Sequence, residues 1–596
     1  MKDPATPEGS GPREAEAHQA DAPEAGSHEP EAREAFRRAI RLHTDGQLEA
    51  AVDAYRDILK RHPKAALGWT NLGAALRKLG RKDEGLQVLL EGERHCPGVI
   101  NLCFNLGNAL TEAGDHEGAL KRYRAILARD PRHLMAAVGA GSALAQRKRF
   151  PEVVDHYRTA LAWHPDNATL YGALGWALWT LRRLEPAAAA YRRAIAIDPG
   201  PAHLHASLQR ALALLGRYTE DERQLRDAAA REKNSPALLA ALGQTLVNQG
   251  RLDEGRQYCD AALAIDPDHA YARRGRARAN FLAGRYAAAW PDYRWRRSRL
   301  EGRAPDATRR EWEGQDLDGR SIALYPEQGL GDIIQFARYA PLVAQRGASV
   351  VLYCPPPLTR LLERLPGVSE VVPTNRPCPR TDWICSLVDL PAVLGIDPDV
   401  DAASCPYLPT NTRPGPLLPP TRQFRVGIVW AGNPNYGRDR LRSCRLHDFA
   451  PLIELPGTEF VSFQVGPRAA ELRESGWHGL VRDAGEKLAP FEMTADALAE
   501  VDLVITVDTA MAHLAGALGR QVWTLLSFAP DWRWQLGRID TPWYPTMRLF
   551  RQPAPDDWAG AFREVRRELA ALVGDWKNRR TARSAREPVQ PTAATD

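Results

Sequence analysis

The chain has 596 residues, of which 44% are hydrophobic and 26% charged, and this composition excludes a fully disordered, collagenous or purely coiled-coil protein. Its 79 basic and 74 acidic residues leave a net charge of +5, which argues against a dedicated nucleic-acid binder. The eight cysteines form no C-x-x-C pair and have no histidine cluster beside them. We therefore expect no metal site, no disulfide framework and a cytoplasmic location.

The two ends of the chain are predicted to be tails. Residues 1–31 are acidic and rich in Pro, Gly and Ala, and they lack the apolar segment of a signal peptide. Residues 577–596 are interpreted as a second solvated tail. No run of about 18 apolar residues occurs, so we expect no membrane-spanning helix.

Proline spacing predicts a repeat array in the first half. Five prolines lie 34 residues apart, and Pro267 restores this register after Lys233 takes the intervening slot. A period of 34 is that of the tetratricopeptide repeat, so we expect an α-solenoid of about eight units over residues 32–300. The five prolines are Pro63, Pro97, Pro131, Pro165 and Pro199. Small residues recur with them at Gly73, Gly107, Gly141, Gly175 and Gly243, and turn glycines at Gly46, Gly80, Gly114, Gly216, Gly250 and Gly284.

Solenoids of this kind have a concave groove that binds extended peptides or partner helices. Asn71, Asn105 and Asn108 are the candidate residues of a polypeptide-binding groove. The corresponding slot holds Gly139 or Ala173 in other repeats, so a complete asparagine ladder is not expected. The alternative is that these asparagines are ordinary surface residues.

After residue 310 short apolar runs alternate with helical stretches, which predicts βαβ units and parallel sheets. We expect two Rossmann-like halves, 310–415 and 424–576, facing each other across a cleft and joined by the proline-rich segment 411–423. The predicted strands are 321–328, 348–354 and 381–387 in the first half, and 424–432, 458–466, 501–508 and 521–527 in the second.

The segment VDLVITVDTAMAHLAGALG (501–519) predicts a buried strand that ends at Asp508 and a helix that begins near Thr509. Free backbone N–H groups at such a helix start bind phosphate, and His513 lies one turn further on the same face. Asp508, Thr509 and His513 are therefore candidate phosphate-site residues. The alternative is that Asp508 caps the helix and His513 packs at its surface.

The segment EQGLGDIIQF (327–336) places Gly329, Gly331 and Asp332 at another strand-to-helix turn. The glycines permit close backbone approach to a ligand, and Asp332 is positioned to act as a general base. The alternative role for Asp332 is that of a helix cap.

Two loops of the second half carry further candidates. WAGNPNYGRDRLRSCRL (430–446) holds Arg440 and Arg442, whose guanidinium groups suit phosphate, although a solvated charged loop is the alternative. The aromatic residues of 528–553 stack on a base or sugar, or else they pack in the core.

The motifs VITVDTAMAHLAGALGRQVW and GLGDIIQFARYAPLVAQRG resemble those of the heptosyltransferase-like glycosyltransferases, over roughly 310–575. The resemblance implies a GT-B fold and inverting, metal-independent transfer from a nucleotide sugar, with no further cofactor. It implies that Asp332 is the base and that Asp508, Thr509 and His513 contact the donor. The family's phosphate-contacting lysine has no clear match, and Arg440 or Arg442 is its candidate replacement.

A repeat array before a transferase also resembles the layout of protein O-GlcNAc transferases and flagellin-modifying transferases. The resemblance implies a polypeptide Ser or Thr hydroxyl as acceptor, on a flagellin-like protein docked by the array. One alternative is a non-catalytic adaptor with a degenerate transferase region, which the missing lysine and Ala510, where the family often has glycine, favour. The other is a glycosyltransferase that builds glycans or lipopolysaccharide. The sugar, the nucleotide and the oligomeric state are left open.

Overall fold

The computed structural model describes residues 30–296, 309–399, 405–409, 416–485 and 490–584. The chain divides into two compact units, one ending at Leu212 (unit 1) and one beginning at Ala213 (unit 2). Residues 1–29 of the predicted N-terminal tail lie outside the described residues.

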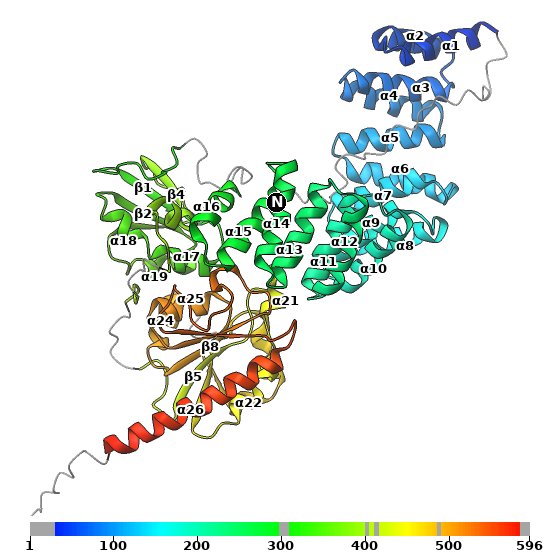
Figure 1. Ribbon diagram of the computed structural model, residues 1–596. Helices are drawn as coiled ribbons and strands as arrows, with labels where there is room; N and C mark the ends of the chain where they lie inside the picture. Colours follow the sequence, from blue (N-terminus) through cyan, green and yellow to red (C-terminus); the bar gives the residue numbers. More distant parts are fainter. Residues whose placement is uncertain (1–29, 297–308, 400–404, 410–415, 486–489, 585–596) are drawn as a thin grey trace, which may run out of the picture. The chain divides into compact units, whose positions relative to one another are not determined.

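Sixteen consecutive helices fill residues 30–294 of the described chain, in eight helix–turn–helix pairs that follow the predicted period (Figure 1). The expected helical repeat array is thus confirmed. The pairs are α1 (Pro30–Thr44) and α2 (Leu48–Arg61), α3 (Ala66–Lys78) and α4 (Lys82–His95), α5 (Ile100–Glu112) and α6 (His116–Arg129), α7 (Leu134–Gln146) and α8 (Phe150–Trp163), α9 (Ala168–Thr180) and α10 (Leu184–Ile197), α11 (Ala202–Leu214) and α12 (Tyr218–Arg231), α13 (Pro236–Asn248) and α14 (Leu252–Ile265), α15 (Ala270–Leu282) and α16 (Tyr286–Arg294).

The turn inside each pair needs one residue in the left-handed region. All six turn glycines adopt a positive φ, between 72° and 82°. Lys148 and Arg182 occupy the same slot in the fourth and fifth repeats, with φ of 57° and 61°. Since side chains other than glycine disfavour this conformation, these two turns are strained relative to the others.

The small residues of the repeats allow the paired helices to approach. A Cβ added to Gly107 would lie 2.7 Å from the ring of Tyr123, and one on Gly141 would lie 2.3 Å from Tyr157. Tyr123 also fills the space beside Gly139 of the next repeat. The aromatic side chain therefore packs within its own repeat and against the following one.

The α/β part of unit 2 contains two fully parallel sheets. The first has the order β3-β2-β1-β4, and the second has the order β7-β6-β5-β8-β9-β10. Numbered within each sheet, these orders are 3-2-1-4 and 3-2-1-4-5-6, and the second is that of the doubly wound Rossmann fold. The strands are β1 (Ser321–Tyr325), β2 (Ser349–Cys354), β3 (Val368–Pro373), β4 (Trp383–Ser386), β5 (Phe424–Val429), β6 (Thr458–Ser462), β7 (Val481–Asp483), β8 (Leu503–Val507), β9 (Val522–Leu526) and β10 (Met547–Arg551).

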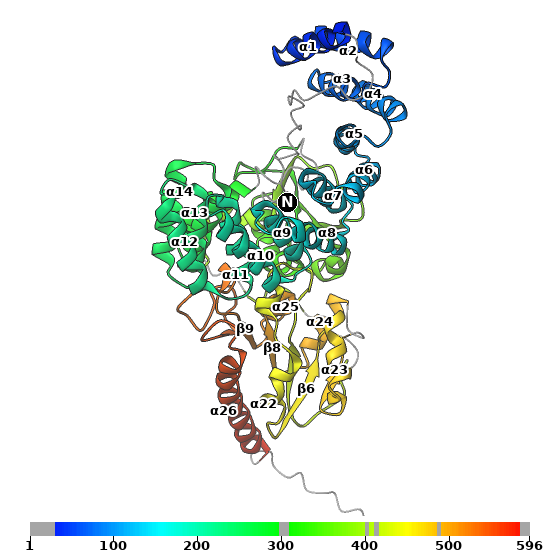
Figure 2. The same cartoon turned by 90° about the vertical axis from the view of Figure 1, so that its right-hand side faces the viewer.

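Helices cover both faces of the second sheet (Figure 2). On one face, side chains such as Val426 and Ile505 pack with α22 (Ala450–Ile453) and α26 (Trp558–Ser584). On the other face, side chains such as Val504 share a core with α24 (Phe491–Leu498) and α25 (Ala510–Ala517). The remaining α-helices are α17 (Leu330–Ala337), α18 (Ala340–Ala344), α19 (Thr359–Leu362), α20 (Leu390–Leu394), α21 (Asp439–Arg442) and α23 (Ala470–Glu474).

The last repeats belong to the same core as the sheets. Phe281 of α15 stacks on Trp532, with ring centroids 4.1 Å apart, and the Leu536 backbone N–H donates to the Leu282 carbonyl at 3.0 Å. Trp290 of α16 also contacts Trp532. Unit 2 therefore combines the final repeats with the α/β region, and the division between the compact units falls within α11.

Several local features differ from the sequence predictions. Strands β3, β7 and β10 were not predicted. The helix predicted after residue 332 is broken into α17 and α18 just before Pro341, whose ring cannot continue a helix. The predicted C-terminal tail begins later than 577, because α26 continues to Ser584 and the Lys577 ammonium donates to the Pro456 carbonyl at 2.8 Å. Residues beyond 584 lie outside the described ranges.

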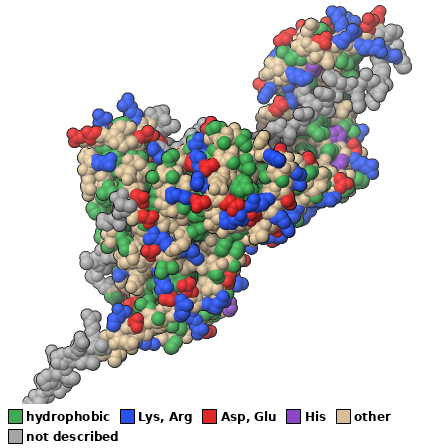
Figure 3. All heavy atoms as spheres, in the orientation of Figure 1, with side chains coloured by type: hydrophobic (Ala, Val, Ile, Leu, Met, Phe, Trp, Pro, Cys, Tyr) green, Lys and Arg blue, Asp and Glu red, His purple; other side chains and the backbone are tan. Residues whose placement is uncertain are grey.

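Charged side chains on the repeat helices of unit 2 pair between consecutive repeats. Arg226 pairs with Glu254 and Arg251 with Glu222, each at 2.7 Å. Figure 3 shows basic and acidic side chains interspersed over the face in view rather than gathered by sign.

Candidate functional site

The N-terminal ends of α17 and α25 meet between the two sheets of unit 2 (Figure 1). Each helix follows a central strand, β1 in the first sheet and β8 in the second. A Cβ added to Gly331 would lie 2.8 Å from His513 Cδ2 and 3.3 Å from Ala510 Cα. The glycine at position 331 thus permits the contact between the two helix ends, which we call the α17–α25 junction. Carboxyl ends of parallel strands are where ligands bind in such folds.

Asp332 lies at this junction with both carboxylate oxygens engaged. Oδ2 accepts a hydrogen bond from the Gly329 backbone N–H at 2.7 Å, so Asp332 caps α17. Oδ1 lies 2.5 Å from Nη2 of Arg533, and the Asp332 side chain is 20% exposed. Burial raises the pKa of Asp332, and the positive charge of Arg533 opposes that rise. The capping role is therefore present.

Arg533 is the cation that joins the two halves of the site. It comes from the loop after β9, and its side chain is 5% exposed. Its Nε donates to Gln335 Oε1 at 2.8 Å and its Nη1 to Asp531 Oδ1 at 2.7 Å. The guanidinium also lies 4.5 Å from the ring centroid of Trp532. The two hydrogen bonds and the ring contact hold the guanidinium in place beside Asp332.

Asp508 and Thr509 sit where β8 passes into α25. Thr509 caps the helix, its hydroxyl accepting from the Met511 backbone N–H at 3.3 Å. Burial and the neighbouring Asp531 carboxylate raise the pKa of Asp508 to about 6, while Arg442 and Arg533 oppose that rise. The expectation that Asp508 itself caps α25 is not met, because Thr509 takes that role. Asp508 instead belongs to a group of acidic and basic side chains at the helix start.

His513 is buried in α25, 4% exposed, with its ring edge against Gly331. Its Nδ1 lies 3.0 Å from the hydroxyl oxygen of Tyr544, and its ring stacks on Trp534 at a centroid distance of 5.3 Å. Burial lowers the pKa of His513 well below its ordinary value, and Arg533 and Arg338 act in the same direction. The imidazole is therefore neutral at pH 7 and is not a surface residue.

The two candidate arginines lie in different places although a single residue, Leu441, separates them. Arg442 lies 4.4 Å from the ring centroid of Tyr436, and its Nε donates to Asp439 Oδ1 at 3.1 Å. It is also among the cations that lower the pKa of Asp508 and Asp332 against the effect of burial. Arg442 therefore lies close enough to the junction for its charge to act on both carboxylates.

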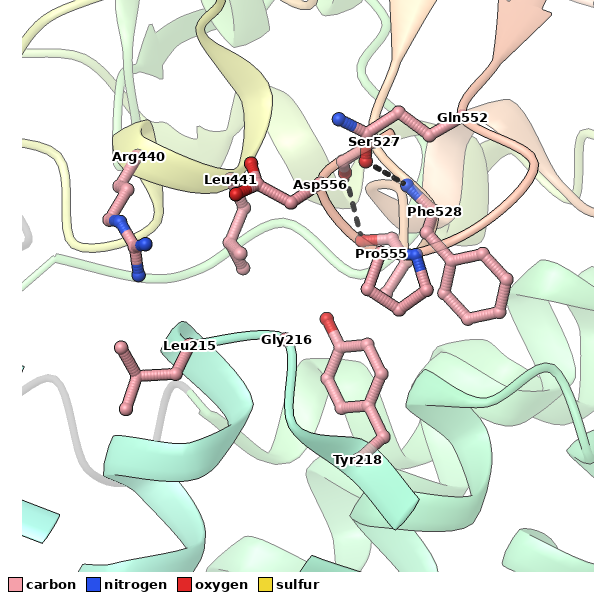
Figure 4. A pocket seen from close by; sticks show the side chains of 11 residues that line it. Leu215, Gly216, Tyr218, Arg440, Leu441, Ser527, Phe528, Gln552, Pro555 and Asp556 are labelled. Atoms are coloured by element: carbon pink, nitrogen blue, oxygen red, sulfur yellow. Dashed lines mark hydrogen bonds between the residues drawn. The ribbon is translucent and has the colours of Figure 1, made fainter. Parts of the chain in front are cut away.

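Arg440 instead faces the turn of the sixth repeat. Its Nη1 donates to the Leu214 carbonyl at 3.2 Å. Figure 4 shows it in a small pocket opposite Leu215 and Gly216, beside the ends of β9 and β10. The prediction that Arg440 joins the phosphate-binding residues finds no support in this placement.

The candidate groove asparagines are buried in unit 1. Asn105 is 4% exposed and donates to the Asn101 carbonyl at 2.9 Å. Asn108 is 6% exposed, and its Oδ1 accepts from the Tyr123 hydroxyl at 2.7 Å. Asn71 is 6% exposed. They are therefore not ordinary surface residues, and the amides of Asn105 and Asn108 bond within the array.

Sequence reasoning missed Arg533 and Asp531, and it did not place Tyr544 beside His513. The aromatic-rich segment 528–553 was considered only for its aromatic residues, and Trp532, Trp534, Trp543 and Tyr544 prove to be buried in the core. Trp532 is flanked by an acidic residue, Asp531, and a basic residue, Arg533, soon after a predicted parallel strand. That charged pair at a strand's carboxyl end is the signal that could have located them.

The junction combines the features that a bound anion and a reacting hydroxyl require. The positive end of the α25 dipole, with Arg442 and Arg533 nearby, favours phosphate. Asp332 supplies a carboxylate at the same place. Among the described residues, no group of three or more His, Cys, Asp or Glu side chains is arranged to hold a metal ion.

Comparisons with known proteins bear on the repeats. The chain matches the tetratricopeptide repeat family over residues 44–99, 104–154, 154–202 and 240–294. These matches coincide with the paired helices of the array. The helical half of the chain is a tetratricopeptide-repeat solenoid. No helix in the described part of the chain is long and apolar enough to cross a membrane.

Among curated proteins, Protein FlbA of Caulobacter vibrioides is 27% identical over 335 residues, which cover 49% of this chain and 54% of FlbA. The chain thus spans about half the length of that relative. Among solved structures, MamA from Desulfovibrio magneticus RS-1 is 23% identical, covering 28% of this chain and 95% of its own, with a TM-score of 0.26. YrrB, a TPR protein with an unusual peptide-binding site, is 21% identical, with coverages of 31% and 96% and a TM-score of 0.27.

Proposed function

We propose that the protein is an inverting, metal-independent GT-B glycosyltransferase that moves a sugar from a nucleotide donor to a Ser or Thr hydroxyl of a polypeptide docked by the tetratricopeptide repeats. The observation that carries the proposal is the meeting of α17 and α25 at Gly331, which places Asp332 beside a helix start with Arg442 and Arg533 nearby. The two parallel sheets, in the orders 3-2-1-4 and 3-2-1-4-5-6, support the GT-B assignment.

In this proposal the nucleotide phosphates bind at the N-terminal end of α25. Its backbone N–H groups and the cations of Arg442 and Arg533 would neutralise the charge that develops on the leaving phosphate. Such groups stabilise the transition state more than the ground state when they are fixed in advance. The hydrogen bonds and ring contacts of Arg533 fix it in this way.

Asp332 is proposed to take the proton of the acceptor hydroxyl as the oxygen attacks the anomeric carbon from the side opposite the leaving phosphate. Burial raises the pKa of Asp332 and so strengthens it as a base, whereas the positive charge of Arg533 favours the ionised carboxylate. The solenoid would raise the local concentration of the acceptor. A flagellin-like protein is the acceptor that the sequence resemblance suggests. The transfer is proposed to take place in the cytoplasm.

Transfer to an acceptor tests this proposal. The full chain is incubated with UDP-, GDP-, CMP- and ADP-linked sugars and a candidate acceptor protein, and the acceptor is weighed by intact-mass spectrometry. Asp332→Asn should lower transfer by roughly 10²–10⁴-fold, the usual contribution of a general base. Asp448→Asn is the matched control, because Asp448 Oδ2 likewise accepts the backbone N–H of the residue three positions earlier, Arg445, at 2.8 Å. Full transfer by Asp332→Asn would remove Asp332 from the mechanism.

A non-catalytic adaptor is the second candidate. The observation in its favour is that both oxygens of Asp332 already have partners, Gly329 and Arg533. An adaptor would bind its polypeptide partner but no nucleotide or nucleotide sugar. A glycan-building enzyme would transfer to a small or lipid-linked acceptor and leave the mass of every protein unchanged.

A further inference from the structure

The four arginines of α15 fall into two groups. Arg273 and Arg276 both form ion pairs with Asp292 of α16, at 3.4 and 2.5 Å. Arg274 and Arg278 lie one helical turn apart, and neither forms an ion pair within the described part of the chain. Arg274 is exposed and Arg278 is partly exposed. The last repeat therefore presents positive charge that is not ion-paired.

The repeat register places Arg278 in the slot of a candidate groove residue. It follows Asn108 by five periods of 34 residues. Its Nη1 donates to Asn248 Oδ1 at 2.6 Å, and its Nη2 donates to the Pro530 carbonyl at 3.2 Å. Both of these partners are neutral, so the hydrogen bonds fix the guanidinium without cancelling its charge. Arg278 thus joins the last repeat to the loop after β9.

A second arginine holds the same loop from the side of the second sheet. Arg438, which follows β5 and is partly exposed, donates through Nη2 to the Ala529 carbonyl at 3.1 Å. Arg278 and Arg438 therefore bind adjacent carbonyl groups. Burial and the charge of Arg438 lower the pKa of Arg278 to about 10, whereas Tyr218 and Asp531 oppose that fall. Both guanidinium groups are still charged at pH 7, and an anion bound between them would relieve their repulsion.

An aromatic contact fixes the start of this loop. The ring of Tyr218 stacks on that of Phe528, with centroids 6.1 Å apart, and both rings border the small pocket in Figure 4. Burial raises the pKa of Tyr218, and the charges of Arg438 and Arg278 oppose that rise, so the two cations lie close to this ring. A loop held in this way presents its cations without a further cost of ordering them.

The same loop carries the ion-pair partner of Asp332. Asp531 acts on Arg278 through its charge, but its Oδ1 already accepts a hydrogen bond from Arg533, which pairs with Asp332. The chain from Pro530 to Arg533 spans at most about 10 Å even when it is extended. An anion bound by the two unpaired arginines therefore lies within reach of the carboxylate that is proposed to activate the acceptor hydroxyl.

We infer that Arg278 and Arg438 bind the carboxylate of an Asp or Glu side chain of the acceptor polypeptide, and that Arg274 attracts further acidic residues of the same segment. The identity of the acceptor as a polypeptide rests on the proposed function. Guanidinium groups suit carboxylates, and the groove slot of Arg278 favours a polypeptide as their source. The acidic residue should lie within about six residues of the modified Ser or Thr, because an extended chain advances about 3.3 Å per residue.

Fluorescence anisotropy of labelled peptides with the full chain tests the inference. Each peptide has a central Ser in a Gly and Ala background, flanked on both sides by Glu, Gln or Lys residues. At low salt the Glu peptide should bind about tenfold more tightly than the Gln peptide, and the Lys peptide should bind least. The double variant Arg278→Gln/Arg438→Gln should reduce this preference to about twofold or less. Arg440→Gln is the matched control, because it removes the same charge two positions from Arg438 but faces the Leu214 carbonyl.

Equal binding of the Glu and Gln peptides by the wild-type chain would overturn the inference, and so would a Glu preference that survives in the double variant. A double variant that loses affinity for UDP, GDP, CDP or ADP but keeps the Glu preference would assign the arginines to the donor instead, which also overturns it. Arg274→Gln, at an exposed position, keeps the test decisive if the double variant does not fold. It should lower the preference about threefold, and no change would contradict the inference.

The peptide measurement needs no nucleotide sugar, so it separates this inference from the proposed function. A Glu preference that depends on Arg278 and Arg438 supports the acidic-peptide site even if no sugar is transferred, in which case the proposed function fails alone. Transfer that is equally efficient to the Glu and Gln peptides would support the proposed function and overturn the inference.

Discussion

Arg533 and Asp332 form an ion pair across the α17–α25 junction, with Nη2 and Oδ1 2.5 Å apart. Asp332 lies in the first turn of α17, which follows β1 of the first sheet, and Arg533 lies in the segment that follows β9 of the second sheet. The same arginine is anchored through Trp532, which stacks on Phe281 of the last repeat. The pair therefore connects the terminal repeats, the first sheet and the second sheet at one point.

Arg533→Gln should move the pH dependence of transfer to higher pH. Burial raises the pKa of Asp332 and Arg533 opposes the rise, so without the guanidinium the pKa rises further. Less of the base is then ionised at any given pH, and the acid limb of kcat/KM shifts upward. Loss of this buried partner should also destabilise unit 2 by about 3 kcal/mol. The pH–rate profile checks the first effect and denaturant unfolding the second. An unshifted acid limb would show that Arg533 does not control Asp332.

Asp508→Asn should stabilise the protein at pH 7. The folded-state pKa of Asp508 is about 6, above its ordinary value, so the folded state binds a proton more tightly than the unfolded state does. The free energy of unfolding therefore falls as pH rises through this window, and by pH 7 the ionised carboxylate is a net cost. The substitution should raise stability at pH 7 by on the order of 2 kcal/mol, and the gain should disappear near pH 4. Thermal unfolding at both pH values checks this; an equal effect at both would contradict it.

Gly331→Ala should disturb the junction. The new methyl group would lie 2.8 Å from His513 Cδ2 and close to the Ala510 backbone, which cannot withdraw without moving α25. We expect a loss of about 1–3 kcal/mol in stability and a marked loss of nucleotide affinity. Gly437→Ala is the control, because a Cβ there meets nothing within 4 Å. Equal behaviour of the two variants in denaturant unfolding would show that the junction is not closely packed.

Lys148→Gly should stabilise the solenoid. Lys148 is exposed and has φ of 57°, in a slot where six other repeats have glycine. Relief of this backbone strain should raise the free energy of unfolding by about 0.5–1 kcal/mol. The reverse change, Gly114→Lys, should destabilise by a similar amount. Urea unfolding followed by circular dichroism measures the free energy of unfolding of both variants. Changes of the same sign in the two variants would contradict this prediction.

The repeat array could be predicted from the sequence because its signals are local and periodic. Glycine in the turns and small residues opposite Tyr123 and Tyr157 follow from backbone geometry and close packing within one repeat. The central strands β1, β5 and β8 were predicted for the same reason, since both their faces are buried and they read as apolar runs. Strand β3 carries an exposed Glu370 at the sheet edge, and β7 has only three residues, so neither gives such a run.

The arrangement of the candidate site depends on contacts between distant segments, which no local pattern records. Phe281 and Trp532 meet across some 250 positions, and their stacking moves the boundary of the compact unit into the repeats. Arg440 and Arg442 look alike in sequence, yet α21 is one short turn that directs them to different neighbours. Gly331, Asp332 and His513 could be identified as candidates from the sequence. The ion pair of Asp332 with Arg533 and the hydrogen bond of His513 with Tyr544 became apparent only in the three-dimensional structure.

Nucleotide binding at the α17–α25 junction is the central claim, and calorimetric titration of the full chain with UDP, GDP, CDP and ADP measures it directly. The account predicts that one of them binds and that Arg442→Ala weakens its binding by about 10–100-fold, as expected for a lost charge-assisted hydrogen bond. Arg440→Ala should leave the affinity unchanged, because Arg440 faces Leu214. Binding of none of the four, or equal losses in the two variants, would contradict the account.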